Sequence, residues 1–323
     1  MFTGENVVAD ASQIKLVVKA KTKAAEGVVA LTLTRPDGRR LPDWTPGSHI
    51  DIVLPSGICR QYSLCGDRWD AHNYRIAVLH EEQGRGGSAY IHDELAEGSA
   101  VGLGGPRNNF LLVPSEKYVF VAGGIGITPM LPMIQQADLM GADWKLLYLG
   151  RSRRTMAFLD ELASFGERVM ILPKDELGAC PLPELIGEAS IDTKVYVCGP
   201  QRLLTAVENH CADWPVGFLR LEHFAAKTQG APARDIPFEV ELARAGLCVT
   251  VSPEISVLEA LQNAGVQMLT SCREGTCGTC EVTVLDGEPD HRDSILGEAD
   301  RKAGNCMFPC VSRSCSDRLV LDM

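Results

Sequence analysis

Six of the twelve cysteines fall within residues 272–315, and their spacing restricts how this part of the chain can fold. Cys272, Cys277 and Cys280 follow the pattern C-x4-C-x2-C, and the next segment leads to Cys310. In a long chain, clustered cysteines indicate metal or redox chemistry more than a disulfide framework. Thiolates are soft, anionic ligands that suit iron–sulfur centres. The glycines between these cysteines allow the backbone to wrap closely around such a centre.

The spacing is typical of plant-type ferredoxins, in which C-x4-C-x2-C is followed by a distant fourth cysteine. It predicts a [2Fe–2S] cluster held by Cys272, Cys277, Cys280 and Cys310. Backbone N–H groups aimed at sulfur would stabilise the reduced cluster. A zinc site is the alternative, because C-x2-C pairs are common there. Zinc knuckles usually use two short pairs, however, so the iron–sulfur cluster is favoured.

Two neighbouring cysteines compete with Cys310 for the fourth ligand position. Cys306 and Cys315 lie close to it in the sequence, and spacing alone leaves all three open. Cys310 is favoured because its setting, FPCVSR, resembles that of the fourth ligand in ferredoxin domains fused to reductases. The roles of Cys306 and Cys315 are left open.

The length and charge of the chain limit its class. With 323 residues it is too long for one typical core, which indicates two or three domains. A formal net charge of −11 argues against nucleic-acid binding and leaves room for a basic partner protein. No apolar run could cross a bilayer, and the N-terminus lacks the features of a signal peptide. We therefore expect a cytoplasmic protein without membrane attachment.

The apolar pattern divides the chain into domains. Residues 14–113 alternate apolar and polar side chains in short runs, which is typical of an antiparallel barrel or sandwich. One helix is expected to begin near Ser88. From residue 117 onward, strand–helix alternation predicts a parallel sheet. The expected helices in this part cover residues 127–140, 155–166 and 201–214.

A small, polar, Gly/Pro-containing segment then suits a linker. The predicted fold is therefore multi-domain. It comprises an antiparallel β-barrel over residues 1–113, an α/β parallel-sheet domain over 114–225, a linker over 226–236 and a C-terminal α+β β-grasp domain of the plant-type ferredoxin class over 237–323.

Two segments of the predicted barrel can bind a phosphate. Arg60-Gln61-Tyr62-Ser63 ends a strand and offers a guanidinium group, a flat ring and a hydroxyl. Gly84-Arg85-Gly86-Gly87-Ser88 opens the predicted helix, where backbone N–H groups bind phosphate readily. Together they make a mononucleotide site plausible, whereas the first string alone would be an ordinary strand end.

These strings resemble the flavin domain of the ferredoxin–NADP reductase superfamily. The further string GPRNNF, residues 105–110, resembles the branch containing phthalate dioxygenase reductase and the vanillate demethylase reductases, which supply electrons to Rieske oxygenases. The resemblance covers essentially the whole chain and implies FMN as the flavin. It places Arg60 on the phosphate, Tyr62 on the isoalloxazine and Ser63 near its N5. The other residues it implies around FMN are Gln61, Ala77, Val78, Leu79, Arg85, Gly86, Gly87 and Ser88.

A second glycine-rich turn suits a dinucleotide. Gly123-Gly124-Ile125-Gly126-Ile127-Thr128 lies between a predicted strand and helix, where the backbone can approach a pyrophosphate. The string is not G-x-G-x-x-G, so the glycines alone do not establish a dinucleotide fold. Cys198-Gly199-Pro200 ends another predicted strand, where open α/β sheets place ligands.

The resemblance gives these residues roles. It places Cys198 by the nicotinamide C4 and Thr128 close to the flavin, whereas without it Cys198 could equally be a small buried residue. It adds Arg151, Ser152 and Phe224 to the cofactor site. Ser63 and Cys198 are the residues expected at the reacting atoms.

The resemblance implies an NADH-dependent reductase in which hydride passes to FMN and single electrons leave through the cluster. The expected recipient is a separate Rieske-type oxygenase, and the reductase is expected to be a monomer. One alternative is a reductase for a cytochrome P450 or a di-iron hydroxylase. Another is a non-enzymatic, cysteine-rich redox-sensing or zinc-binding module. NADPH is a further alternative, since Arg151, Arg153 and Arg154 could bind its 2′-phosphate, although Asp175 would oppose it.

Overall fold

The computed structural model describes residues 14–227 and 230–323, which belong to two compact units. One unit is Gln13–Glu222, and the other contains His223–Met323. All twelve cysteines lie in the described part, and none of them forms a disulfide. In the same ranges, no helix is long and apolar enough to cross a membrane.

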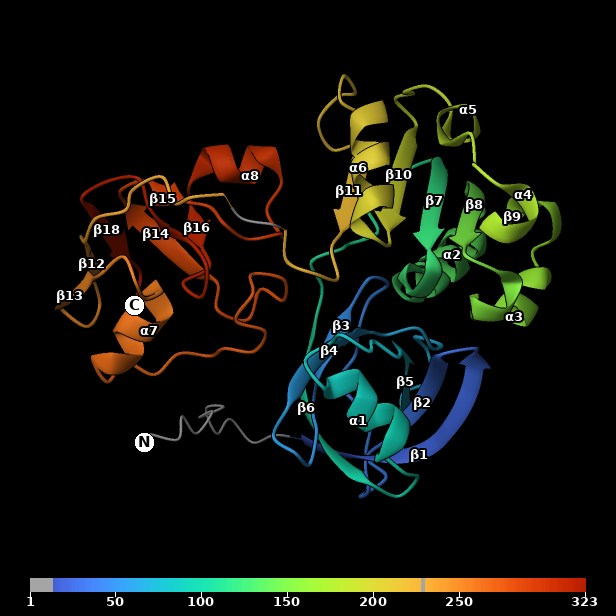
Figure 1. Cartoon of the computed structure of the whole chain (residues 1–323), viewed down its shortest axis with the longest axis horizontal. Helices are drawn as coiled ribbons and strands as arrows, with labels where there is room; N and C mark the ends of the chain where they lie inside the picture. Colours follow the sequence, from blue (N-terminus) through green and yellow to red (C-terminus); the bar gives the residue numbers. More distant parts are fainter. Residues whose placement is uncertain (1–13, 228–229) are drawn as a thin grey trace. The chain divides into compact units, whose positions relative to one another are not determined.

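The first unit begins with a six-stranded antiparallel β-barrel in the order β4-β3-β6-β1-β2-β5 (Figure 1). The edge strands β4 and β5 meet where the Cys65 N–H donates to the Arg75 carbonyl at 2.8 Å. Helix α1 (Gly87–Asp93) packs on the barrel through Ile91, which is fully buried. The strands are β1 (Ile14–Ala25), β2 (Val28–Thr34), β3 (His49–Val53), β4 (Cys59–Ser63), β5 (Asn73–Leu79) and β6 (Ala100–Arg107).

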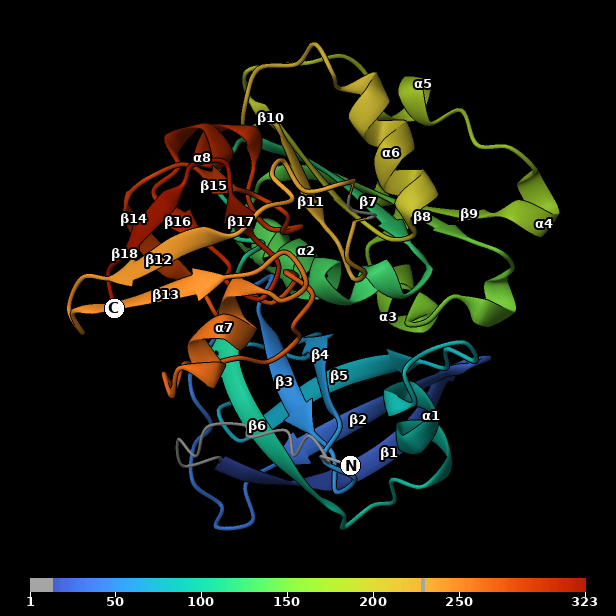
Figure 2. The same cartoon turned by 60° about the vertical axis from the view of Figure 1, so that its left-hand side comes forward.

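A five-stranded parallel sheet completes the first unit, in the order β11-β10-β7-β8-β9. Because side chains alternate along β7 (Lys117–Gly123), Phe120 faces a core shared with α2 (Ile127–Leu139), whereas Val121 faces a core shared with α6 (Gln201–His210). Helices therefore cover both faces of the sheet (Figure 2). Such burial explains the near-continuous apolar strands in the sequence. The strands are β7 (Lys117–Gly123), β8 (Asp143–Gly150), β9 (Val169–Pro173), β10 (Thr193–Cys198) and β11 (Leu219–Glu222).

The helices of this part differ from the expected ones in their lengths, and α4 (Lys174–Leu177) and α5 (Leu182–Ile186) were not predicted. Only residues 159–163 of the helix predicted over 155–166 are α-helical, because Phe158 before them has a left-handed φ of 65°. Its ring lies instead under the Arg75 guanidinium, 4.9 Å away. The helical segments are η1 (Gly124–Gly126), α2 (Ile127–Leu139), η2 (Arg153–Thr155), α3 (Leu159–Ala163), η3 (Gly166–Arg168), α4 (Lys174–Leu177), α5 (Leu182–Ile186) and α6 (Gln201–His210).

The barrel and the parallel sheet share one hydrophobic core. Cys65 and Ala77 of the barrel pack in the same cluster as Met130 and Met133 of α2. Arg75 of β5 also pairs with Glu161 of α3 at 2.6 Å. The barrel and the parallel sheet therefore pack as one unit, and the barrel site has a defined position relative to the sheet.

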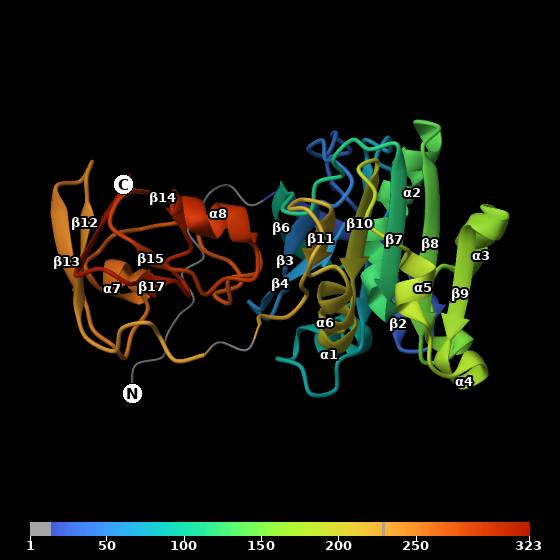
Figure 3. The same cartoon turned by 90° about the horizontal axis from the view of Figure 1, so that it is seen from above.

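The second unit is a β-grasp in which a sheet of order β13-β12-β18-β14-β16 packs on one helix. Figure 3 shows this helix beside β12 and β13. That helix, α7 (Val257–Asn263), begins with a Ser256/Glu259 capping box and buries Val257 and Leu261. The central strands β12 and β18 are parallel, and the other pairs are antiparallel. The remaining elements are β12 (Phe238–Leu242), β13 (Leu247–Val251), β14 (Val282–Asp286), β15 (Pro289–Asp290), α8 (Glu298–Ala303), β16 (Cys306–Met307), β17 (Arg313–Ser314) and β18 (Arg318–Leu321).

Candidate functional site

The two phosphate-seeking segments of the barrel meet at the start of α1. Arg60 donates from Nη2 to the Arg85 carbonyl at 2.6 Å and from Nη1 to the Cys59 carbonyl at 2.7 Å. Gly86 precedes the helix with a left-handed φ of 79°, and a Cβ on Gly87 would lie 2.6 Å from Cγ of Arg60. A guanidinium group thus lies beside a helix start, whose first N–H groups have no intrahelical acceptor. This combination can hold a phosphate.

Gln61, the next residue of the RQYS string, binds a buried carboxylate. Gln61 donates from Nε2 to Asp51 Oδ1 at 2.7 Å, and Arg107 Nη2 lies 2.5 Å from Asp51 Oδ2. Asp51 is 5% exposed and was missed by the sequence analysis, although a charge within the otherwise apolar strand HIDIV is a detectable signal. Tyr62 is partly buried, and burial raises the pKa of its hydroxyl above the ordinary value. Ser63 is buried at the end of β4.

The predicted β5 residues divide between two cores. Val78 points into the barrel core, and its carbonyl lies 2.9 Å from Nε2 of His92. Ala77 and Leu79 belong to the core shared with the parallel sheet. Strand β5 also contacts η1, so that these residues lie beside the glycine-rich turn.

The glycine-rich turn and the CGP segment touch backbone to backbone. Strands β7 and β10 pair in parallel, which puts Ala122 opposite Cys198. A Cβ on Gly126 would lie 2.2 Å from the Cys198 carbonyl oxygen, and one on Gly199 would lie 2.9 Å from Cα of Gly123. The Thr128 hydroxyl donates to the Ile125 carbonyl at 2.9 Å and stabilises the turn. The glycines are therefore needed for this contact as well as for any ligand.

Cys198 faces a carboxyl group at the end of the sheet. Its Sγ lies 3.8 Å from Glu222 Oε2, because β10 and β11 pair these two residues. Burial raises the pKa of Glu222 to about 8 and that of Cys198 well above its ordinary value. Cys198 therefore stays a neutral thiol at physiological pH and is not a thiolate nucleophile.

Arg151 and Ser152 follow β8, where the resemblance implies the adenosine ribose. The Arg151 carbonyl accepts from the Asp175 N–H at 3.1 Å, which brings the acidic segment after β9 beside it. Arg153 is 3.0 Å from Glu176, and Arg154 is 3.6 Å from Glu26. Phe224 lies outside this unit and its side chain is exposed.

The four predicted cluster ligands gather in the second unit. Cys272 is within hydrogen-bonding distance of Cys277 and Cys310, and Cys280 is within that distance of Cys310. All four are buried. Cys306, in contrast, lies on β16 opposite Thr283.

The backbone of the cysteine loop is shaped to surround its thiols. Arg273, Gly275 and Gly278 have left-handed φ angles of 57°, 69° and 75°. The Glu274 N–H donates to Cys272 Sγ at 3.3 Å, and the Thr279 N–H donates to Cys277 Sγ at 3.5 Å. Buried thiols that accept from backbone N–H groups are the kind of ligand that suits an iron–sulfur cluster.

Comparison with known proteins agrees with this geometry. The 2Fe-2S iron-sulfur cluster binding domain matches residues 240–315, which favours the cluster over zinc. Phthalate dioxygenase reductase of Burkholderia cepacia is 37% identical over 316 residues, covering 96% of this chain and 97% of that protein. The chain belongs to the phthalate dioxygenase reductase family.

Other known proteins and solved structures are also similar to this chain. Phenoxybenzoate dioxygenase subunit beta of Ectopseudomonas oleovorans is 40% identical over 320 residues, covering 98% of this chain and all (100%) of that protein. A solved phthalate dioxygenase reductase matches with a TM-score of 0.70 at 36% identity, covering 97% of this chain and 98% of that one. A type IV self-sufficient cytochrome P450 monooxygenase matches all (100%) of this chain with a TM-score of 0.93 at 42% identity. The chain spans only 43% of that larger protein.

The residues present fit the cofactors expected for this member of the phthalate dioxygenase reductase family. The four buried thiols and their N–H donors suit a [2Fe–2S] cluster. Arg60 and the start of α1 suit the phosphate of FMN, beside the ring of Tyr62. The turn between β7 and α2 suits the pyrophosphate of a nicotinamide dinucleotide.

Proposed function

We propose that this protein is the NADH-dependent reductase component of a Rieske-type oxygenase system. It would pass electrons from NADH through FMN and a [2Fe–2S] cluster to a separate terminal oxygenase. One observation carries the proposal: a single compact unit holds both the Arg60–Gly87 phosphate site and the Gly126–Cys198 turn, and the same chain carries the Cys272–Cys280 loop with Cys310 near it. Relatives of full length that are named as reductases of dioxygenases support it.

Each residue has a role in binding or positioning. Arg60 and the first N–H groups of α1 would hold the FMN phosphate, while Tyr62 supports the ring system and Ser63 lies beside it. The turn 123–128 would hold the dinucleotide. Cys198, kept as a thiol by burial and by Glu222, would pack on the nicotinamide without exchanging a proton. When bound, the cofactors supply the conversion of a two-electron hydride into single electrons.

We also propose a cofactor for each domain and a compartment for the protein. We assign residues 1–113 to FMN, 114–225 to NADH, 226–236 to a linker and 237–323 to the cluster. We also propose that the protein is cytoplasmic, since reduced thiols are maintained in that compartment. We further propose that it is a monomer. Its encounter with the oxygenase would be transient and steered by the net charge of −11 toward a basic face.

The pairing of the arginines supports NADH over NADPH. A 2′-phosphate would need unpaired cations near the adenosine ribose. Arg153 and Arg154 are each paired with a glutamate, and Asp175 adds a further negative charge nearby. A phosphate binding to Arg153 or Arg154 would have to displace those carboxylates.

An anaerobic titration tests the proposal. NADH should bleach both the flavin and the cluster absorbance of the purified protein, and the reduced protein should then reduce a Rieske oxygenase from the same organism stoichiometrically. A colourless, zinc-containing protein would refute it. Failure with every Rieske candidate from the same operon would count strongly against the partner.

A second candidate recipient rests on the match to the self-sufficient cytochrome P450 monooxygenase, which covers this whole chain. A separate P450 would then receive the electrons. Offering the reduced protein a P450 and a Rieske oxygenase side by side separates the two, because only the true partner should be reduced rapidly at low salt.

A further inference from the structure

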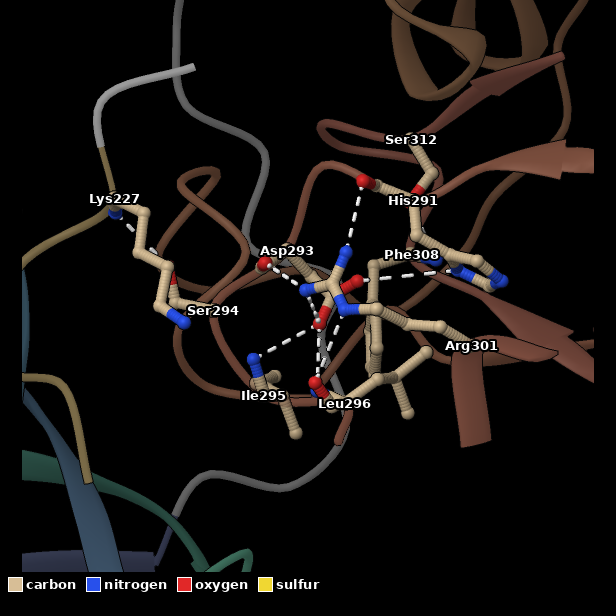
Figure 4. A network of polar contacts seen from close by, with 9 residues as sticks. All are labelled: Lys227, His291, Asp293, Ser294, Ile295, Leu296, Arg301, Phe308 and Ser312. Carbon is tan, nitrogen blue, oxygen red and sulfur yellow. Dashed lines mark hydrogen bonds and ion pairs between the residues drawn. The ribbon is translucent and has the colours of Figure 1, made fainter. Parts of the chain in front are cut away.

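Asp293 is buried beside the cysteine loop and binds the backbone of its own segment (Figure 4). Its side chain is 0% exposed. Asp293 Oδ1 accepts from the Ile295 N–H at 2.9 Å and from the Leu296 N–H at 2.7 Å. A carboxylate at such depth needs strong partners, because burial of an unpaired charge is costly. Two N–H donors and one cation provide them at Oδ1, whereas Oδ2 accepts no hydrogen bond and lies 4.0 Å from His291 Nδ1.

Arg301 is that cation, and it also binds backbone carbonyls of residues 291–296. Its Nη2 lies 3.5 Å from Asp293 Oδ1 and donates to the Asp293 carbonyl at 2.6 Å. Nη1 donates to the His291 carbonyl at 2.9 Å, and Nε donates to the Leu296 carbonyl at 3.1 Å. One guanidinium therefore joins three carbonyls of residues 291–296 and holds this turn in one conformation (Figure 4).

This turn touches the cysteine loop at two places. The Ser294 N–H donates to the Gly275 carbonyl at 2.8 Å. A Cβ on Gly275 would lie 3.0 Å from Cα of Asp293, so the two backbones are in close contact.

The second contact is apolar. Ile295 and Leu296, whose N–H groups bind Asp293, pack against a cluster that contains Cys280 and Cys310. We call Ile295 and Leu296 the apolar cover of these two thiols. The Asp293 carboxylate that holds the turn therefore also holds this cover in place.

We propose that Asp293 is a positioning residue for the iron–sulfur cluster, which holds Ile295 and Leu296 over the Cys280–Cys310 side and excludes water from it. This rests on the proposed cluster. Water near a cluster stabilises its more negative, reduced form and gives chelators access to the ligands. Loss of the cover should therefore raise the reduction potential and shorten the lifetime of the cluster. No sequence pattern in the cysteine loop itself reveals this dependence.

Three variants of the full chain test it. Asp293→Ala removes both acceptor oxygens, whereas Asp293→Asn keeps one oxygen for the two N–H groups. Leu296→Ala removes part of the cover and leaves Asp293 in place. With a chelator under anaerobic conditions, D293A and L296A should lose the cluster absorbance about tenfold faster than wild type. D293N should stay within about twofold of wild type.

The potential gives an independent measurement. D293A should raise the midpoint potential by about 59 mV, which is a tenfold change for a one-electron couple. As a matched control, Asp317→Asn removes an exposed carboxylate that pairs with Arg234 in the same unit. It should change neither the potential nor the lifetime, because solvent screens its charge.

The double variant D293A/L296A separates positioning from general destabilisation. If Asp293 acts by holding the cover, the double variant should lose the cluster no faster than the more affected single variant. Additive losses, or a D293N as labile as D293A, would overturn the proposal. If D293A does not fold, the cluster lifetimes of L296A and D293N are compared instead. L296A should lose the cluster faster than D293N, and equal lifetimes would overturn the proposal. A wild-type protein without any cluster would refute the proposed function instead, whereas a stable cluster in D293A refutes only the role of Asp293.

Discussion

Glu222 Oε2 lies 3.8 Å from the Sγ of Cys198, so that a partly buried carboxyl faces a buried thiol at the end of the parallel sheet. Their pairing follows from the parallel register of β10 and β11. Cys198 was predicted at the nicotinamide site, and its partner gives that site a titratable group near neutral pH.

We expect Glu222 to make the first unit less stable as the pH rises. Burial raises its pKa in the folded protein to about 8 from 4.5. Between these values the folded protein binds a proton that the unfolded chain has released, so the free energy of unfolding falls with pH, by at most about 1.4 kcal/mol per unit. Glu222→Gln should flatten this slope in unfolding experiments from pH 5 to 8. The exposed control Glu188→Gln should keep the wild-type slope, and an unchanged slope in E222Q would contradict the prediction.

Gly87→Ala should weaken FMN binding. The added Cβ would lie 2.6 Å from Cγ of Arg60 and would displace the guanidinium from the start of α1. We expect the Kd for FMN to rise about tenfold, or about 1.4 kcal/mol. Titration of the apoprotein by flavin fluorescence measures it, with Gly230→Ala as the control because nothing lies within 4 Å of its added Cβ. Equal Kd values for both variants would exclude the assigned phosphate site.

Gly126→Ala should impair the use of NADH and leave FMN bound. Its Cβ would lie 2.2 Å from the Cys198 carbonyl, which is backbone and cannot rotate away. We expect the rate of flavin reduction by NADH in stopped flow to fall at least tenfold, or about 1.4 kcal/mol. Chemical reduction by dithionite should be unchanged. If both reductants slowed equally, the effect would lie in the flavin site.

Glu176→Gln should shift the coenzyme preference toward NADPH. It frees Arg153, which lies 3.0 Å from Glu176, to bind a 2′-phosphate. We expect kcat/KM for NADPH to rise about tenfold while that for NADH changes little, since a charge-assisted hydrogen bond contributes about 1.5–3 kcal/mol. Steady-state kinetics with both coenzymes measures it. An unaltered ratio would place the 2′-position away from Arg153.

Cys310→Ser should abolish the cluster and leave flavin reduction by NADH intact. Cys310 lies within hydrogen-bonding distance of Cys272 and Cys280. Cys306→Ser and Cys315→Ser are the matched controls and should retain the cluster absorbance. A cluster that survives in C310S but not in one of the controls would reassign the fourth ligand.

Much of the fold could be predicted because its signals are local. Alternating apolar residues predicted the barrel, continuous apolar strands predicted the parallel sheet, and the cysteine spacing predicted the C-terminal ferredoxin-type domain. The helix expected over 155–166 is shortened to 159–163, because Phe158 has a left-handed backbone, and its ring contacts Arg75 from a segment far away in the sequence. Local propensity cannot report such a contact.

The spacing of the cysteines by itself favoured an iron–sulfur centre over zinc, because ligand number and loop length are properties of the sequence. Only the tertiary structure decided what surrounds it. Asp293 and Arg301 are ordinary charged residues in the sequence, yet the fold buries the carboxylate against Gly275 and ties both to one turn. The physical reason is that burial and pairing depend on which distant segments meet, and that is decided when the whole domain packs.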